Sequence, residues 1–133
     1  MIIATLQWTG FTITAAEVTR VMGRRPYRSA TRGRRQRDSR GRLTERVSRA
    51  GDWSIRSRAP VRSSLATHAM SLAEQLRPLL GRLEKLPHGV QAKARLTVFA
   101  DPLQELLEIP AEAMRVFGQA GVAITIDVYP ETL

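Results

Sequence analysis

The chain has 133 residues, no cysteine and a formal net charge of +9. This length predicts one domain with its own hydrophobic core and leaves no room for a second domain. The absence of cysteine excludes disulfide bonds and thiolate metal sites, and it is typical of a reducing compartment. The first eight residues have no basic cluster and too short an apolar run for a signal peptide or a membrane span, so we expect a cytoplasmic protein.

The N-terminal part predicts a strand followed by a short helix. Residues 2 to 13 are rich in Thr, Ile, Leu, Trp and Phe, which favours a strand with a bulge or bend at Gly10. Thr14 and Glu17 have the spacing of a capping box at a helix start, and Gly23 suits the left-handed conformation that closes a helix. The side chains expected to face the core are Val18, Val21 and Met22.

The positive charge is concentrated in one segment, from Arg20 to Arg62. Fifteen arginines and three acidic residues lie there, so the segment carries +12, whereas the rest of the chain has six basic and nine acidic residues. Its densest part, residues 32 to 42, has almost no apolar side chain to bury and repels itself. We therefore predict an exposed, mobile basic loop, inserted at about residues 24 to 50 of one domain spanning residues 1 to 133.

The next elements are a half-buried strand and a long apolar helix. In Gly51–Arg58, Trp53, Ile55 and Ser57 alternate with Ser54, Arg56 and Arg58, which predicts one core face and one cationic face. Ser63 or Ser64 caps a helix in which Pro78 predicts a kink or a second helix start. Its apolar stripe is formed by Leu65, Ala69, Leu72, Leu76, Leu79, Leu83 and Leu86.

The C-terminal part completes a sheet. We expect strands at Val90–Phe99 and Val122–Tyr129, a short strand at Leu106–Ile109, and a helix at Pro110–Gln119. This element order predicts an α+β fold, with a mixed or antiparallel sheet and helices packed on one face, for which a ferredoxin-like arrangement is the nearest simple model. An exposed edge of that sheet could pair two copies into a homodimer. The residues expected to face inward on the last helix are Ala113, Met114 and Phe117.

Several short segments, in this order, resemble a bacterial family catalogued as a domain of unknown function, DUF4279. In that family's pattern, Pro-x-x-x-Trp-x-Lys-Gly follows the first helix; here Ala30 stands at the Trp and Arg32 at the Lys. The resemblance implies a fold, a bacterial or phage source and an immunity or inhibitor role, and it carries no catalytic residue. The segments are residues 11–23, 26–33, 51–55 and 124–129, together with the long leucine helix.

Residues with catalytic or metal-binding chemistry are few. His68 and His88 are the two histidines, and we interpret them as surface or helix-end residues because no ligand spacing surrounds them. The serines lack a nucleophile elbow, and the glycines match neither dinucleotide-binding nor P-loop patterns. We therefore expect no enzyme, no metal and no cofactor.

The aromatic residues favour core positions. Trp53 and Tyr129 are interpreted as fillers of half-buried strand faces. Trp8 stays open between the core and an outward position beside Arg56 and Arg58, where it could stack on a base or a guanidinium. We expect no pair of closely spaced aromatics on the sheet of the kind that binds RNA.

The arginine segment has three interpretations: a phosphate-binding surface, a docking surface for an acidic protein, and a solvated segment that reflects a GC-rich genome. We expect a non-enzymatic binding protein, first an immunity-type or inhibitor protein that engages an acidic toxin, nuclease or effector. The alternative is an RNA- or DNA-binding accessory protein. The predicted partner-binding residues are Arg28, Arg32, Arg34, Arg35, Arg37, Arg40, Arg42, Arg56 and Arg58.

Overall fold

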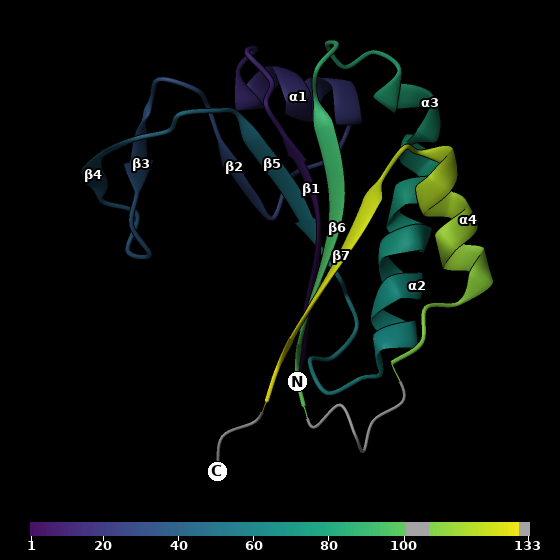
Figure 1. Ribbon diagram of the computed structural model, residues 1–133. Helices are drawn as coiled ribbons and strands as arrows, with labels where there is room; N and C mark the ends of the chain where they lie inside the picture. The colour runs from purple at the N-terminus through teal and green to yellow at the C-terminus, as the bar shows by residue number, and fades with distance from the viewer. Residues whose placement is uncertain (101–106, 131–133) are drawn as a thin grey trace.

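The computed structural model describes residues 1–100 and 107–130, and these form an α+β fold (Figure 1). The strands are β1 (Ile2–Thr9), β2 (Arg28–Ala30), β3 (Arg35–Arg37), β4 (Leu43–Val47), β5 (Asp52–Arg56), β6 (Gln91–Phe99) and β7 (Ala123–Tyr129). The helices are α1 (Ala15–Met22), α2 (Leu65–Leu76), the 3₁₀ turn η1 (Arg77–Leu79), α3 (Leu80–Leu83) and α4 (Ala111–Gln119).

The main sheet has five strands in the order β2-β5-β1-β6-β7. Its neighbours are antiparallel except for β6 and β7, which are parallel and joined by a connection that contains α4. Parallel neighbours require such a crossover. Helices α2 and α4 lie on one side of the sheet (Figure 1). The predicted mixed sheet with helices on one face is confirmed, and the order is compatible with the ferredoxin-like arrangement, which stays a prediction.

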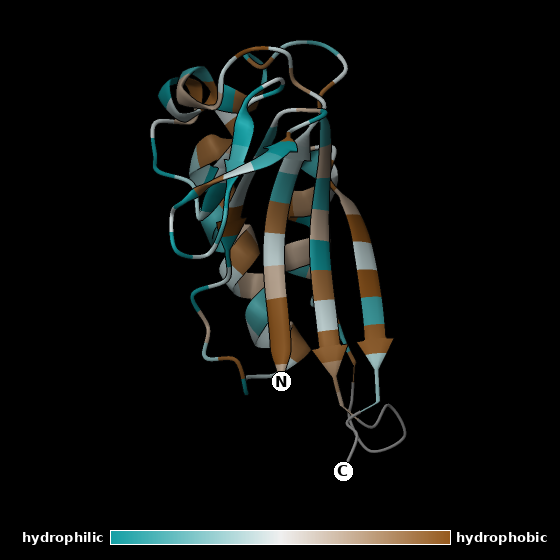
Figure 2. Ribbon diagram, turned by 90° about the vertical axis from the view of Figure 1, so that its left-hand side faces the viewer, coloured by the Kyte–Doolittle hydropathy of each residue, from teal (hydrophilic) through white to brown (hydrophobic). Residues whose placement is uncertain are grey.

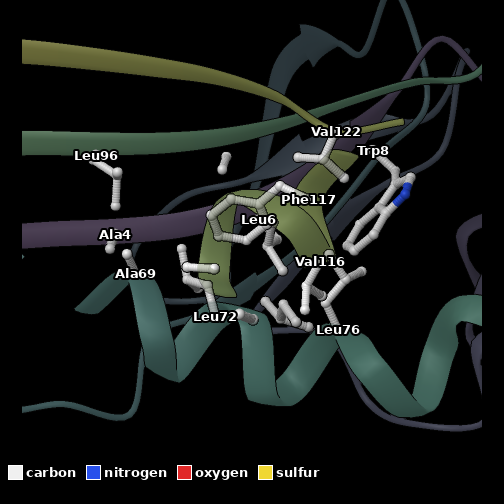
Figure 3. Packing of buried hydrophobic residues seen from close by; sticks show 14 of the residues in the cluster. Ala4, Leu6, Trp8, Ala69, Leu72, Leu76, Leu96, Val116, Phe117 and Val122 are labelled. Carbon is white, nitrogen blue, oxygen red and sulfur yellow. The ribbon is translucent and has the colours of Figure 1, made fainter. Parts of the chain in front are cut away.

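The core lies between the sheet and the helices. Along β1, the side chains of Ile2, Ala4, Leu6 and Trp8 are buried, whereas the alternate residues face the other side of the sheet. This period of two places every second side chain on one face. Figure 3 shows Leu6 close to side chains from both α2 and α4. The helix residues labelled there are Ala69, Leu72 and Leu76 of α2 and Val116 and Phe117 of α4.

Both predicted caps of α1 are present in the structure. The Thr14 hydroxyl accepts a hydrogen bond from the Glu17 amide at 3.1 Å, and the Glu17 carboxylate accepts one from the Thr14 amide. Gly23 ends the helix with φ of 69°, in the left-handed region. Val18 and Met22 are buried, whereas Val21 is partly exposed. The local sequence therefore determines both ends of α1.

The long leucine helix breaks at Pro78, as predicted. Ser64 caps α2, which runs to Leu76, and η1 and α3 follow without a gap. Proline has no amide hydrogen to donate to the preceding turn, so the α-helical bonding pattern changes there. The buried leucines of α2 still form one stripe, which packs on β1.

Several predicted boundaries and faces differ from the structure. The predicted bend at Gly10 is present, with φ of 86° and the Gly10 amide bonded to the Gly51 carbonyl at 3.1 Å, but strand β1 ends at Thr9 and does not continue to Ile13. No strand forms at residues 107–109, and Leu106 lies outside the described residues. Met114 is exposed, because the inward face of α4 is formed by Ala113, Val116 and Phe117.

The basic segment is more regular than predicted. Its residues 28–30 form β2 in the main sheet, and its residues 35–47 form a separate two-stranded hairpin, β3 with β4. All three residues of β3 are exposed, so the predicted exposure is confirmed, while strands stand where a loop was expected and the mobility stays a prediction. We call residues 34–48 the arginine arm.

Candidate macromolecular interface on the arginine arm

The arm leaves the main sheet on the side away from α2 and α4 (Figure 1). Seen from that side, it crosses in front of the sheet, and the helices lie behind (Figure 2). Its base is fixed by two backbone hydrogen bonds, Gly33 N–H to the Ser48 carbonyl and Ser48 N–H to the Arg34 carbonyl, both 2.9 Å. Ser48 is buried at this junction. The arm is therefore anchored at its base and exposed along its length.

The turn of the arm is organised by Asp38. Its Oδ1 accepts hydrogen bonds from the amides of Arg40 and Arg42, both at 2.9 Å, and its Oδ2 accepts one from the Arg42 guanidinium at 3.2 Å. The backbone bond from Arg42 is the main reason that the pKa of Asp38 lies below its ordinary value. Gly41 takes a φ of 78° that other residues rarely adopt. The turn is thus set by one carboxylate and one glycine.

Two guanidinium groups of the arm are oriented by backbone carbonyls rather than by carboxylates. Arg35 Nε donates to the Thr44 carbonyl at 2.8 Å, and Arg37 Nη1 donates to the Gly41 carbonyl at 2.7 Å. Of the fifteen arginines from Arg20 to Arg62, Arg42 is the one that forms an ion pair within the described part of the chain. Each guanidinium has five N–H donors, so most of them stay available to a partner.

Apolar side chains lie beside these arginines. The register of the hairpin pairs Arg35 with Val47 and Arg37 with Leu43, with a bulge between the two pairs. Directly opposite residues of an antiparallel pair share a face. Leu43 and Val47 are both 52% exposed. The arm therefore presents cationic forks and uncovered apolar side chains on one surface.

A cavity of about 820 Å³ lies where the arm meets the main sheet. Its lining includes two carboxylates, Asp38 from the arm and Asp52 from β5. Gln7 on β1 donates to both oxygens of Asp52, at 3.2 and 3.1 Å, which fixes this carboxylate on the uncovered face. The arginines that line the cavity are Arg28, Arg34, Arg35 and Arg37. Its charge is therefore predominantly positive.

Tyr27 forms a small cation–π cluster next to this cavity. The guanidinium carbons of Arg28 and Arg56 lie 5.4 and 5.3 Å from the centre of its ring. Arg56 Nη1 also donates to the Tyr27 hydroxyl at 3.2 Å. Tyr27 is 48% exposed. An exposed aromatic ring between two cations is suited to stacking as well as to charge recognition.

The structure brings eight of the nine predicted residues to this region and separates the ninth. Arg32, Arg34, Arg35, Arg37, Arg40 and Arg42 lie on the arm or the turn that leads into it, and Arg28 and Arg56 flank Tyr27. Arg58 instead lines a different cavity, beside Arg24, because β5 ends at Arg56 and the alternation stops there. Its predicted place on the same cationic face is wrong.

Sequence reasoning missed Tyr27, Leu43 and Val47 as exposed side chains of this region. Tyr27 directly precedes Arg28 in the basic segment, so an aromatic among arginines was the available signal. Leu43, Glu45 and Val47 alternate with Thr44 and Arg46, which is the pattern of a short strand. These two apolar residues were the signal that the segment contains a strand.

Of the two aromatic residues predicted to lie in the core, one does and one does not. Trp53 is fully buried, as predicted, and Trp8 is buried beside it with ring centres 5.6 Å apart. Tyr129 is 51% exposed and stacks on Phe99 at 5.5 Å, so its predicted core position is wrong. The cause is its place on the edge strand β7, in register with Phe99. Phe99 and Tyr129 are thus neighbouring aromatics on the sheet, and the expected absence of an RNA-binding aromatic pair stays a prediction.

His68 is not a surface residue, contrary to prediction. It is 2% exposed, and its Nδ1 lies 2.8 Å from the Ser57 hydroxyl oxygen. Burial is the main cause that lowers the pKa of His68, which favours the neutral ring. No carboxylate among the described residues is hydrogen-bonded to this pair. His88 lies exposed in the turn before β6.

The fold and the interface define a small α+β protein with a projecting cationic arm. A family model described as a domain of unknown function, DUF4279, matches residues 1–131, so the chain belongs to this family. No curated protein and no solved structure matches the chain. Among the described residues, no helix is both long enough and apolar enough to cross a membrane.

Proposed function

We propose that this chain is a non-enzymatic protein-binding protein whose arginine arm docks on an acidic surface of a partner protein. The proposal rests on one observation: Arg35 and Arg37, which form no ion pair among the described residues, lie opposite the exposed Val47 and Leu43 on the arm. Protein interfaces are enriched in arginine and contain a desolvated apolar centre. The projecting position of the arm leaves both kinds of side chain free to enter a partner's cleft (Figure 1).

The charge of the arm supports an acidic partner. Arg35 and Arg37 are oriented by backbone carbonyls rather than by carboxylates, so a partner's carboxylates can form the charge-assisted bonds that the chain itself does not supply. Such complementarity speeds association and makes it sensitive to salt. This combination suits an immunity or inhibitor protein that covers the acidic cleft of a nuclease toxin or effector, in a bacterial or phage setting and in the cytoplasm.

The alternative function is nucleic-acid binding through the same region. Tyr27 between Arg28 and Arg56 favours it, since a base can stack on the ring while the cations contact phosphates. Leu43 and Val47 do not favour it, because a phosphate backbone gains nothing from apolar side chains. We therefore place the protein partner first.

A pair of double variants separates the two functions. Arg35→Gln/Arg37→Gln removes charge from the arm, and Leu43→Ser/Val47→Ser removes its apolar contacts. Both are titrated calorimetrically against the protein encoded by the neighbouring gene and against single-stranded RNA, at about 50 and about 200 mM salt. We expect both double variants to weaken the protein complex by about tenfold or more. We expect RNA binding, where present, to fall in the arginine variant alone.

The matched control is Arg20→Gln/Arg62→Gln, which removes the same charge outside the arm and should bind as the wild type does. Loss of affinity equal to that of the arm variant would mean that net charge, rather than the arm, governs binding. A Leu43→Ser/Val47→Ser variant with undiminished affinity for the neighbour-encoded protein would overturn the proposal. Tight RNA binding in that variant would establish the alternative.

A further inference from the structure

A second cationic cavity lies apart from the arm, on the helix side of the β2–β5 edge. It has a volume of about 630 Å³ and is bounded by the end of α1, the end of β5, α2 and α3. Four arginines and one carboxylate, Glu74, contribute to its lining. The arginines are Arg24, Arg25, Arg58 and Arg82. They come from three separate parts of the chain, so the fold assembles this charge.

Two of these guanidinium groups are fixed by neutral partners. Arg24 Nη2 donates to Oε1 of the buried Gln75 at 3.2 Å, and Gln75 is itself held by the Arg56 carbonyl and the Ser71 hydroxyl. Arg82 Nη1 donates to the Val21 carbonyl at 3.3 Å. The Arg82 guanidinium lies against Gly23, where an added Cβ would be 2.6 Å from its Nη1. Gly23 therefore leaves the space that Arg82 occupies.

The charges of this cavity are uncompensated within the described chain. None of the four arginines forms an ion pair there, so four positive groups face one glutamate. Burial is the main cause that lowers the pKa of Arg24, and the nearby charge of Arg58 lowers it further. Holding like charges together in a partly buried place costs free energy, and an anion between them would remove that cost.

We infer that this cavity binds a small phosphate-bearing molecule of about the size of a nucleoside diphosphate. An excess of three positive charges matches a diphosphate better than a single carboxylate, and guanidinium forks bond two phosphate oxygens at once. The volume lies in the usual range of small-molecule sites. The exposed Pro78 adds an apolar side chain against which the remainder of the ligand can pack.

The test is calorimetric titration of the full chain with pyrophosphate, with ADP and, as a comparator, with succinate, at constant ionic strength. We expect saturable one-site binding of pyrophosphate or ADP, tighter than that of succinate; the stronger of the two phosphate ligands identifies free or nucleoside-linked diphosphate. Arg24→Gln and Arg82→Gln should each weaken that binding by about tenfold or more. Glu74→Gln should strengthen it, roughly two- to fivefold.

The opposite sign expected for Glu74→Gln guards against variants that lose binding because they unfold, and thermal unfolding is measured for each. The matched control is the arm variant Arg35→Gln/Arg37→Gln, which removes charge but leaves this cavity intact. The inference would be overturned if the control bound pyrophosphate or ADP as weakly as the cavity variants do, or if succinate bound more tightly than both phosphate ligands. It would also be overturned if the chain bound an oligonucleotide but neither pyrophosphate nor ADP. The arm variant's behaviour toward a protein partner is a separate measurement, so the two proposals can fail independently.

Discussion

The five-stranded sheet and the arginine arm obtain their structure from different interactions. Every second side chain of β1 is buried against α2 and α4, so the main sheet is stabilised by the removal of apolar surface from water. In the arm, all of β3 is exposed, and backbone hydrogen bonds and the Asp38 turn determine the conformation. A two-stranded hairpin is marginal in water without such support.

The difference separates folding from recognition. Because the arm buries little, its side chains are not needed for the core, and their chemistry can change without loss of the fold. The clustered positive charge in fact opposes the folded state, since like charges repel. Hydropathy shows the same division: the strands of the main sheet alternate between polar and apolar residues, while the arm in front of them is mostly polar (Figure 2).

Among the variants that test this difference between the main sheet and the arm, Leu72→Ala should have the largest effect on stability. Leu72 is fully buried between α2 and the sheet, so the substitution removes apolar contacts and leaves a cavity (Figure 3). We expect the free energy of unfolding to fall by about 2–5 kcal/mol. The matched arm variant, Arg37→Ala, should change it by less than about 0.5 kcal/mol. Urea unfolding followed by circular dichroism measures both, and comparable losses would show that the arm is part of the folding core.

A smaller effect is expected at the junction of arm and body, for Gly51→Ala. An added Cβ would lie 2.2 Å from Cδ2 of the buried Phe11 and 2.7 Å from its carbonyl oxygen, so the chain must shift. We expect a loss of about 1–3 kcal/mol in the free energy of unfolding. Gly118 is the control, because it lies in α4 with open space around it, and Gly118→Ala should be neutral or stabilising. A Gly51→Ala variant as stable as wild type would mean that the junction is loosely packed.

The structure outside the arginine arm could largely be predicted from the sequence, because the sequence patterns that determine its helices and strands are local. Thr14, Glu17 and Gly23 mark both ends of α1, and Pro78 breaks the long helix by its own covalent structure. The alternation in β6 correctly separates buried Ala94, Leu96 and Val98 from exposed neighbours. Periodicity predicts a face reliably where one side of an element is buried.

The rest depended on tertiary contacts that no local pattern contains. The hairpin in the basic segment is formed by hydrogen bonds between β3 and β4, and composition alone favoured an irregular loop there. Arg58 and Arg24 converge because β5 ends beside the segment that follows α1. Tyr129 is exposed because β7 is an edge strand, a fact about strand order rather than about the strand itself. The second cationic cavity therefore became visible only in three dimensions.

The smallest expected effect is a pH dependence of the turn that Asp38 orders, and the main sheet should not show it. The pKa of Asp38 is lowered mainly by the backbone bond from Arg42, so the carboxylate is bound more tightly in the folded turn than in a disordered one. Its stabilising contribution is complete above the ordinary aspartate pKa of about 3.9 and is lost as the pH falls through the lowered folded value. We expect the amide NMR shifts of Arg40 and Arg42 to titrate below pH of about 3.9, while core amides such as that of Leu96 stay unchanged.

Asp38→Ala distinguishes this cause from a general acid effect, because it removes both backbone acceptor bonds at once. In that variant the two amides should exchange with solvent faster at neutral pH, and their low-pH titration should disappear. A midpoint at or above the ordinary aspartate value, or an unchanged titration in Asp38→Ala, would show that another group orders the turn. The orientation of Arg37 provides a further readout, since its guanidinium bonds to the Gly41 carbonyl within the same turn. If the turn loosens, that arginine loses its fixed direction.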